Sequence, residues 1–147
     1  MKGEKMVITH KRLVRIASLA LVIVLCFSVL APIASAEGSA YITNYITSMT
    51  AGSGGKVTAW FQITGTGTMD EIGVTKVTIY ENGTLIKTYL STSTSGMMGN
   101  NTVVHAGSVT YSGTVGKSYY AHVTYKAGKD GGYDNRSVDT NTVTAKN

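Results

Sequence analysis

Two histidines are the residues beyond position 36 whose chemistry could most readily support catalysis or metal binding. His105 and His122 could each act as a general base or as a metal ligand. The sequence contains no His-x-His or His-Glu-x-x-His spacing, and its single cysteine, Cys26, lies in the first 36 residues. A serine nucleophile would need an elbow such as Gly-x-Ser-x-Gly, and none occurs. We therefore predict structural histidines, no catalytic residues, no metal centre and no cofactor.

Side-chain oxygens gather in two polar segments, Asp70-Glu71 and the stretch from Lys129 to Asn135. Calcium takes six to eight oxygen ligands, so either segment could contribute to a calcium site. The spacing does not match an EF-hand, however, and solvated turn residues explain both clusters more simply. Nothing in the sequence places two of these acids together as a glycosidase requires.

An aromatic and cationic row is a candidate binding surface. Tyr120, His122, Thr124 and Lys126 alternate along one predicted strand, where they could stack on sugar rings or contact a protein. Cross-strand pairing explains the row equally well, because aromatic and threonine side chains are favoured on half-exposed sheet faces.

Met97 and Met98 are the two apolar residues of a polar, glycine-rich loop. They could be adaptable contacts for a partner, because methionine side chains adjust to irregular surfaces. Alternatively, the loop folds back and the two side chains cover one open end of the domain. The second interpretation is the one we favour.

The first 36 residues have the features of a helical signal peptide. Five bases and one acid lie in the first 18 residues, ahead of an apolar run from Leu19 to Leu30 that Pro32 ends. The small residues Ala34 and Ala36 suit the −3 and −1 positions of a signal peptidase site. The sequence therefore predicts cleavage before Glu37 and secretion of the remainder.

The predicted mature chain, residues 37–147, is a single domain that does not span a membrane. Its eight bases and seven acids give a net charge of +1, whereas the whole chain carries +5. These charges are interspersed, so there is no basic block that would capture nucleic acid. An uncleaved anchor over residues 16–34 is the alternative, because 19 residues are just long enough to span a bilayer.

An all-β pattern runs through the mature chain. Alternating segments rich in Val, Ile, Thr and Tyr recur between Gly, Asn and Ser clusters, and no stretch shows helical spacing. The predicted strands cover residues 40–48, 56–64, 75–81, 84–90, 102–111, 117–126 and 138–144. The two-residue period places Val57, Ala59, Phe61 and Ile63 on a core face, with Trp60 on the opposite face.

Turn residues separate these strands. Asn82-Gly83 is the dipeptide best suited to a type I′ hairpin turn, since both central residues need positive φ. Polar segments at 65–71, 91–101 and 127–135 are predicted as one long turn and two loops. Gly107, inside a strand, indicates a bulge or a close backbone approach.

The most regular predicted strand places Tyr119, Ala121 and Val123 on one face. Tyr119 follows Gly116 by three residues. This pattern resembles the penultimate strand of fibronectin type III and immunoglobulin-like domains, where a leading tyrosine forms a corner with upstream backbone. The resemblance implies that role for Tyr119. With about seven strands, it also implies a single Greek-key sandwich of two sheets. A small open barrel is the alternative.

Four further segments share a second likeness. They are Gly65 to Gly73, Gly96 to Gly99, His105 to Tyr111 and Ala127 to Gly132. Together they resemble a family of small secreted proteins of Gram-positive bacteria that is catalogued as a domain of unknown function. The resemblance covers almost all of the mature chain and implies secretion, but it supplies no activity and no site residues.

These observations predict a non-enzymatic, secreted binding or surface-interaction module whose partner is a cell-surface glycan or protein. Loops 91–101 and 127–135 are the expected contact regions, because loops carry function in such scaffolds. The candidate contact residues are Tyr120, His122, Lys126, Met97, Met98, Asp130 and Asp134.

Two alternatives stay open. An enzyme of unfamiliar type would need a pocket that joins His105 or His122 to Asp70, Glu71 or Asp130. A structural protein of the cell envelope would assemble through its edge strands.

Overall fold

The computed structural model describes residues 38–147, and it consists of strands and the turns between them. The strands are β1 (Ile42–Ala51), β2 (Lys56–Glu81), β3 (Thr84–Leu90), β4 (Met98–Ser112), β5 (Ser118–Lys129), β6 (Gly132–Asp139) and β7 (Val143–Thr144). Among these residues no helix has the length and hydrophobicity that crossing a membrane requires. The predicted signal peptide, with Ala34 and Ala36, lies outside the described residues.

All seven strands belong to one antiparallel hydrogen-bonded network, which confirms the all-β prediction. The main path runs β1-β2-β5-β6, with β3 and β4 paired to β2 and β7 paired to β5. The long strand β2 is therefore the centre of the fold, since it pairs with four others.

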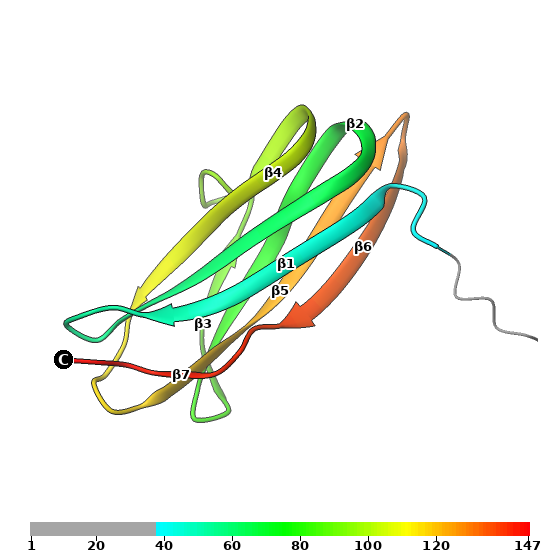
Figure 1. Cartoon of the computed structure of the whole chain (residues 1–147). Helices are drawn as coiled ribbons and strands as arrows, with labels where there is room; N and C mark the ends of the chain where they lie inside the picture. Colours follow the sequence, from blue (N-terminus) through cyan, green and yellow to red (C-terminus); the bar gives the residue numbers. More distant parts are fainter. Residues whose placement is uncertain (1–37) are drawn as a thin grey trace, which may run out of the picture. The chain divides into compact units, whose positions relative to one another are not determined.

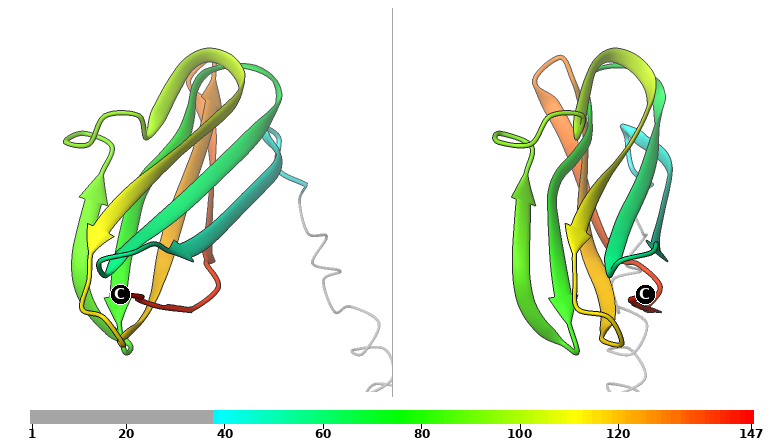
Figure 2. Two further views of the ribbon diagram at one scale, coloured as in Figure 1. Left: turned by 60° about the vertical axis from the view of Figure 1, so that its left-hand side comes forward. Right: turned by 90° about the vertical axis from the view of Figure 1, so that its left-hand side faces the viewer.

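Both β2 and β4 fold back on themselves at one end of the domain (Figures 1 and 2). Residues 56–64 of β2 pair with β1 and with residues 104–112 of β4, and these three segments form what we call the front layer. Residues 71–81 of β2 pair with β5, and with β3 and β6 they form the back layer. The two layers face each other across the core.

The bend of β2 corrects the sequence prediction of two strands separated by a turn at 65–71. The chain does reverse there, but it stays extended and resumes its ladder with β4 at the pair Met69–Thr102. Gly65 allows the close approach, because a Cβ at this position would lie 2.8 Å from the Met69 side chain. Pairing with β4 thus keeps this Gly- and Thr-rich segment in strand conformation.

The core lies between the two layers and follows the two-residue period. Val57, Ala59, Phe61 and Ile63 of the front layer are all fully buried, as the sequence predicts. The back layer contributes a second set of fully buried side chains: Ile72, Val74, Val77, Ile79, Tyr119, Ala121, Val123 and Tyr125. Removing this apolar surface from water is the main source of stability in a domain without disulfides, at about 25 cal/mol per Å².

Two predicted loops are shorter than the sequence suggests. Residues 127–135 were expected to form a loop, but β5 continues to Lys129 and β6 begins at Gly132, so Asp130-Gly131 alone forms the turn. Similarly, β4 begins at Met98, within the predicted loop 91–101. In both segments, hydrogen bonds to a neighbouring strand keep the backbone extended. The polar side chains of these segments give no sign of this pairing in the sequence.

Two local expectations about glycine are met. Asn82 and Gly83 have φ values of 46° and 84°, as a type I′ turn between β2 and β3 requires. Gly107 lies opposite Phe61 in an unbroken ladder, so it marks a close approach and not a bulge. A Cβ at this position would lie 2.5 Å from the Gly96 carbonyl oxygen and 2.8 Å from the Phe61 ring.

Tyr119 is hydrogen-bonded to the backbone just upstream of it and to the end of β2. Its buried hydroxyl accepts a hydrogen bond of 2.7 Å from the Thr114 amide and donates one to the Glu81 carboxylate. Gly113 leaves room for the ring, because a Cβ there would lie 2.6 Å from the ring. The turn before β5 is thereby fixed to the end of β2.

Side chains from the rest of the domain cover both edges of the front layer. At the β1 edge, Tyr125 donates a hydrogen bond of 2.7 Å to the Ile46 carbonyl, and the Asn141 amide bonds both the Met49 N–H at 2.9 Å and its carbonyl at 3.0 Å. At the β4 edge, Tyr89 donates one of 2.8 Å to the Thr110 carbonyl. The contacts at Met49 and Thr110 occupy edge-facing backbone groups that a further strand would otherwise pair with, whereas the Ile46 carbonyl faces β2 and is reached from the core.

The last residues lie at the end opposite the bends of β2 and β4 (Figure 1). Gly55 donates a hydrogen bond of 2.7 Å to the Lys146 carbonyl, and Gly116 donates one of 2.9 Å to the Ala145 carbonyl. The C-terminus is therefore fixed to two turns at that end.

Candidate functional site

An open pocket of about 330 Å³ lies at the end where β2 bends and β5 turns into β6. Three segments that are far apart in the sequence line it: Asp70, Glu71, Asn100, Gly128, Lys129, Gly131, Gly132 and Tyr133. The pocket therefore brings together the acidic pair and parts of both segments that the sequence predicts as contact regions.

The β5–β6 hairpin is positioned on the β2 bend by one charged hydrogen bond. The backbone N–H of Asp130 donates to Asp70 Oδ2 at 2.8 Å. Asp130 and Gly131 have φ values of 52° and 82°, which a two-residue Asp-Gly turn between Lys129 and Gly132 requires. The turn and the acidic bend thus form one rim.

A lysine links the wall of the pocket to its exposed aromatic ring. Lys126 forms an ion pair with Glu71, and its ammonium nitrogen lies 4.9 Å from the centroid of the Tyr133 ring. Tyr133 remains 58% exposed. Because Lys126 holds Glu71 and contacts one face of the ring, the tyrosine is oriented while much of its surface stays open to a ligand.

The pocket is lined by groups that can form hydrogen bonds and by an aromatic ring. A carboxylate, an amide and an exposed phenol from Asp70, Asn100 and Tyr133 provide hydrogen-bond acceptors, donors and a stacking surface. Neither His105 nor His122 lines it. Within residues 38–147, no three His, Cys, Asp or Glu side chains lie close enough together to hold a metal ion.

The two histidines have local partners. His105 Nε2 lies 3.0 Å from the Gly96 carbonyl oxygen, and His122 Nδ1 lies 2.6 Å from Asp139 Oδ1 on β6. The first contact attaches the loop before β4 to the strand itself. The second is a cross-strand pair on the outer face of the back layer.

The outward row of β5 consists largely of paired side chains. The Tyr120 ring stacks on Tyr80 of β2, with centroids 4.8 Å apart and planes inclined by 3°. Thr124 accepts a hydrogen bond of 3.1 Å from the Ser137 hydroxyl. With His122 and Lys126 also paired, cross-strand contacts account for the positions of these residues, and only Lys126 lies next to the pocket.

Met97 is fully buried in the core, so it is not available as a contact residue. Its carbonyl accepts a hydrogen bond of 2.7 Å from the Val74 amide, and the absence of a side chain at Gly73 makes room for this approach. Met98 is half-buried beside the same glycine. The loop therefore folds back so that the Met97 side chain covers the core, which is the arrangement favoured from the sequence.

Asp134 holds the first residues of the described chain. Its Oδ2 accepts hydrogen bonds from the Ser39 hydroxyl at 2.5 Å and from the Tyr41 amide at 2.9 Å. These two bonds, the Ser39 one foremost, lower the pKa of the Asp134 carboxyl below its ordinary value. Of the two acids expected as contacts, Asp130 lies in the pocket rim and Asp134 has this structural partner.

Tyr133 and Asn100 are the pocket residues that the sequence does not single out. Tyr133 was in principle detectable, because it is the only aromatic residue in a glycine-rich segment, 127–135. Asn100 carries no such signal. Its position in the pocket follows from the pairing of β4 with the bend of β2 at Glu71.

Comparison of the chain with known proteins finds no match among protein-family models, curated proteins or solved structures.

Proposed function

We propose that residues 37–147 form a secreted, non-enzymatic binding module that recognises a ligand through the pocket between the β2 bend and the β5–β6 hairpin. The observation that carries this proposal is the convergence of Asp70, Asn100 and Tyr133 on one open pocket. The ligand class that suits it is a polar group of a cell-surface glycan or extracellular protein.

The proposal includes an immunoglobulin-like or fibronectin-III-like sandwich as the fold. Three observations support it: a front layer of three strands, a back layer in which β5 lies between β6 and β2, and the bond from Tyr119 to the upstream Thr114 amide. In such scaffolds the connections at the ends of the layers carry binding. The pocket lies at such an end.

Of the two alternatives, the enzyme is the less supported one. It would need a histidine in the pocket with the acids, and His105 and His122 are bonded elsewhere. Assembly through edge strands has the covered backbone groups of Met49 and Thr110 against it.

Export is the proposal for residues 1–36, with a Gram-positive bacterium as the source that the resemblance suggests. Expression of the full sequence in a Gram-positive host tests it. The protein is expected to accumulate in the medium, and its intact mass is expected to match a chain that begins at Glu37. A cell-bound product that retains residues 16–34 would establish the anchored alternative.

The binding proposal is tested with protein expressed from the full sequence and purified in the form that accumulates. Saturable binding to intact Gram-positive cells, isolated cell walls or immobilised culture-supernatant proteins is expected. The Tyr133→Ala variant should bind at least tenfold more weakly, because it loses the stacking surface. Thr92→Ala, in the exposed turn after β3, is the matched control. Equal binding by wild type and Tyr133→Ala would rule out the pocket as the site.

A further inference from the structure

The outer face of the front layer carries a single charged side chain, Lys56, at one end of its central strand. The register places the even-numbered residues of 44–50, 58–64 and 104–110 side by side on this face. All twelve are Asn, Gln, Ser, Thr, Ala, Ile, Val or Trp, so none of them is charged, and Lys56 follows at the end of the β2 row, opposite Ser112. We call it the Trp60 face. In a domain with eight bases and seven acids interspersed along the chain, such a face is distinctive.

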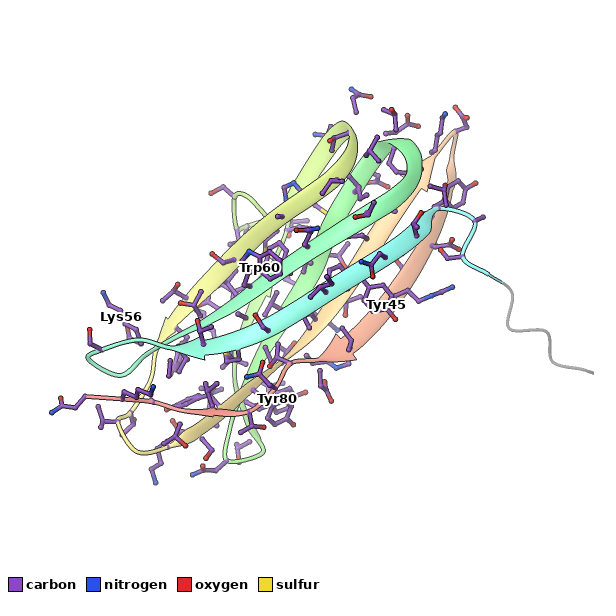
Figure 3. The ribbon with its side chains drawn as sticks, in the orientation of Figure 1. Tyr45, Lys56, Trp60 and Tyr80 are labelled. Atoms are coloured by element: carbon purple, nitrogen blue, oxygen red, sulfur yellow. The ribbon has the colours of Figure 1, made fainter. Side chains whose placement is uncertain are left out.

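Trp60 lies at the middle of this face, on the central strand β2 (Figure 3). Its neighbours across the ladder are Ser48 on β1 and Ser108 on β4. Both side chains are too short to cover an indole ring, and Trp60 remains 36% exposed. An aromatic ring that would be covered by larger neighbours in most sheets is open here.

Hydroxyl and amide groups surround the ring at a regular spacing. Ser48 and Ser108 lie about 5 Å to either side, and Thr58 and Gln62 lie about 7 Å along the strand, as sheet geometry dictates. The Thr58 and Thr110 hydroxyls bond each other at 2.9 Å. Among the side-chain hydrogen bonds of residues 38–147, none involves Ser48, Gln62 or Ser108, so these groups can serve a ligand.

A neutral carbohydrate fits this chemistry better than the other partners that stack on tryptophan. A pyranose ring offers an apolar C–H face to the electron-rich indole face and hydroxyls at its rim to the Ser, Thr and Gln groups. A nucleic acid could stack its bases but would need several Lys or Arg side chains for its phosphates, and the face has one, Lys56, at its end. A protein partner would require a larger contiguous apolar centre, whereas Trp60 has only Ile46 and Ala106 as apolar diagonal neighbours, and Val104 lies further along β4.

We propose that the Trp60 face binds a neutral polysaccharide, with one sugar ring stacked on Trp60 and its hydroxyls bonded by the flanking Ser and Gln side chains. This site is separate from the pocket, since it lies on the outer face of the front layer, and it does not depend on the function proposed for the pocket.

Tryptophan fluorescence gives a direct test, because Trp60 is the only tryptophan of the chain. The purified protein is titrated with the soluble hexasaccharides of cellulose, chitin and starch, and its adsorption to the three insoluble polymers is measured in parallel. At least one series is expected to change the emission and to lower acrylamide quenching at least twofold. Polygalacturonate, an anionic polymer of similar rings, is the charged comparison and should bind at least tenfold more weakly.

Three variants locate the site. Trp60→Ala should lose at least tenfold in adsorption and Trp60→Phe should lose less, whereas the control Thr92→Ala, in the exposed turn after β3, should adsorb like wild type. Should Trp60→Ala fail to fold, Ser108→Glu places a charge beside the ring, leaves the fluorescent reporter in place and should lower the affinity at least tenfold. Unchanged emission and no adsorption with all three neutral glycans would overturn the proposal, as would equal binding of polygalacturonate. Loss of binding in Tyr133→Ala with retention in Trp60→Ala would assign it to the pocket instead.

Discussion

The hydroxyl of Tyr125 in the back layer donates a hydrogen bond of 2.7 Å to the carbonyl oxygen of Ile46 in the front layer. The tyrosine ring crosses the core beside Tyr45, with ring centroids 5.2 Å apart, and reaches the edge strand β1. One side chain thus fills the core and connects the two layers. Tyr45, on β1, is labelled in Figure 3.

Tyr125→Phe should destabilise the domain by about 1 kcal/mol, because the hydroxyl bond is lost while the packing of the ring is kept. Urea denaturation at neutral pH measures this difference. A loss above about 3 kcal/mol would mean that the ring itself had moved.

Alkaline pH should weaken the same contact. Burial raises the pKa of Tyr125 to about 12, whereas a tyrosine in the unfolded chain ionises near pH 10. The stability from this group is therefore complete below about pH 10 and is lost as the pH rises through about 12. Denaturation curves between pH 9 and 12 should show a steeper loss for wild type than for Tyr125→Phe. Parallel losses would contradict this assignment.

Removing the Tyr119 hydroxyl should cost about 1.5 to 3 kcal/mol, because it bonds the Glu81 carboxylate as well as the Thr114 amide. Tyr119→Phe tests this by thermal and chemical denaturation. Tyr120→Phe, at the next position on the outer face, is the control and should change stability by less than about 0.5 kcal/mol. Similar effects of the two substitutions would remove the special role of Tyr119.

The attachment of the first residues to β6 should be lost in acid. The hydrogen bonds from Ser39 and Tyr41 lower the pKa of Asp134, so the unfolded or detached carboxyl takes up a proton more readily. The stabilisation is present above the ordinary carboxyl range near pH 4 and is lost as the pH falls through the lower, folded value. The protection of the Tyr41 amide from hydrogen exchange, relative to its intrinsic rate at the same pH, should fall there. Asp134→Ala removes the acceptor and should lack this protection at neutral pH, whereas unchanged protection in wild type at low pH would contradict the prediction.

Truncation of Met97 should destabilise the domain by about 2 to 5 kcal/mol, the range for removing a large buried aliphatic or thioether side chain. Met97→Ala is compared with Val115→Ala, whose side chain is 50% exposed and should change stability by less than about 0.5 kcal/mol. Chemical denaturation of both variants distinguishes a core side chain from a surface contact. A Met97→Ala protein as stable as wild type would show that the loop can leave the core.

The strands that sequence analysis located correctly are those with one buried face. In residues 56–64 and 118–126 the apolar side chains alternate with polar ones, so the residue types alone predict which side chains are buried. The turn at Asn82-Gly83 was also predicted correctly, because few residue pairs adopt positive φ at two successive positions. Such features depend on local geometry, which neighbouring residues determine.

Strand β6 was not detectable for the opposite reason. The residues of β6 on its inner, less exposed face are Gly132, Asp134, Arg136 and Val138. Of these four, only Val138 has an apolar side chain. This segment is a strand because it forms backbone hydrogen bonds with β5, and this pairing is a tertiary contact that the segment's own residues do not indicate. The pocket was unpredictable in the same sense, since the contact of Asp130 with Asp70 joins residues that are 60 positions apart.

The fixed C-terminus has a practical consequence for every binding measurement. Lys146 and Ala145 bond to turns at the end of the domain away from the pocket, whereas Ser39 and Tyr41 lie against β6 near it. An affinity tag or a sensor-chip tether added after Asn147, through a flexible linker, should leave the pocket and the Trp60 face turned to solution. A tag placed directly before Ser39 would compete with ligands for the same space.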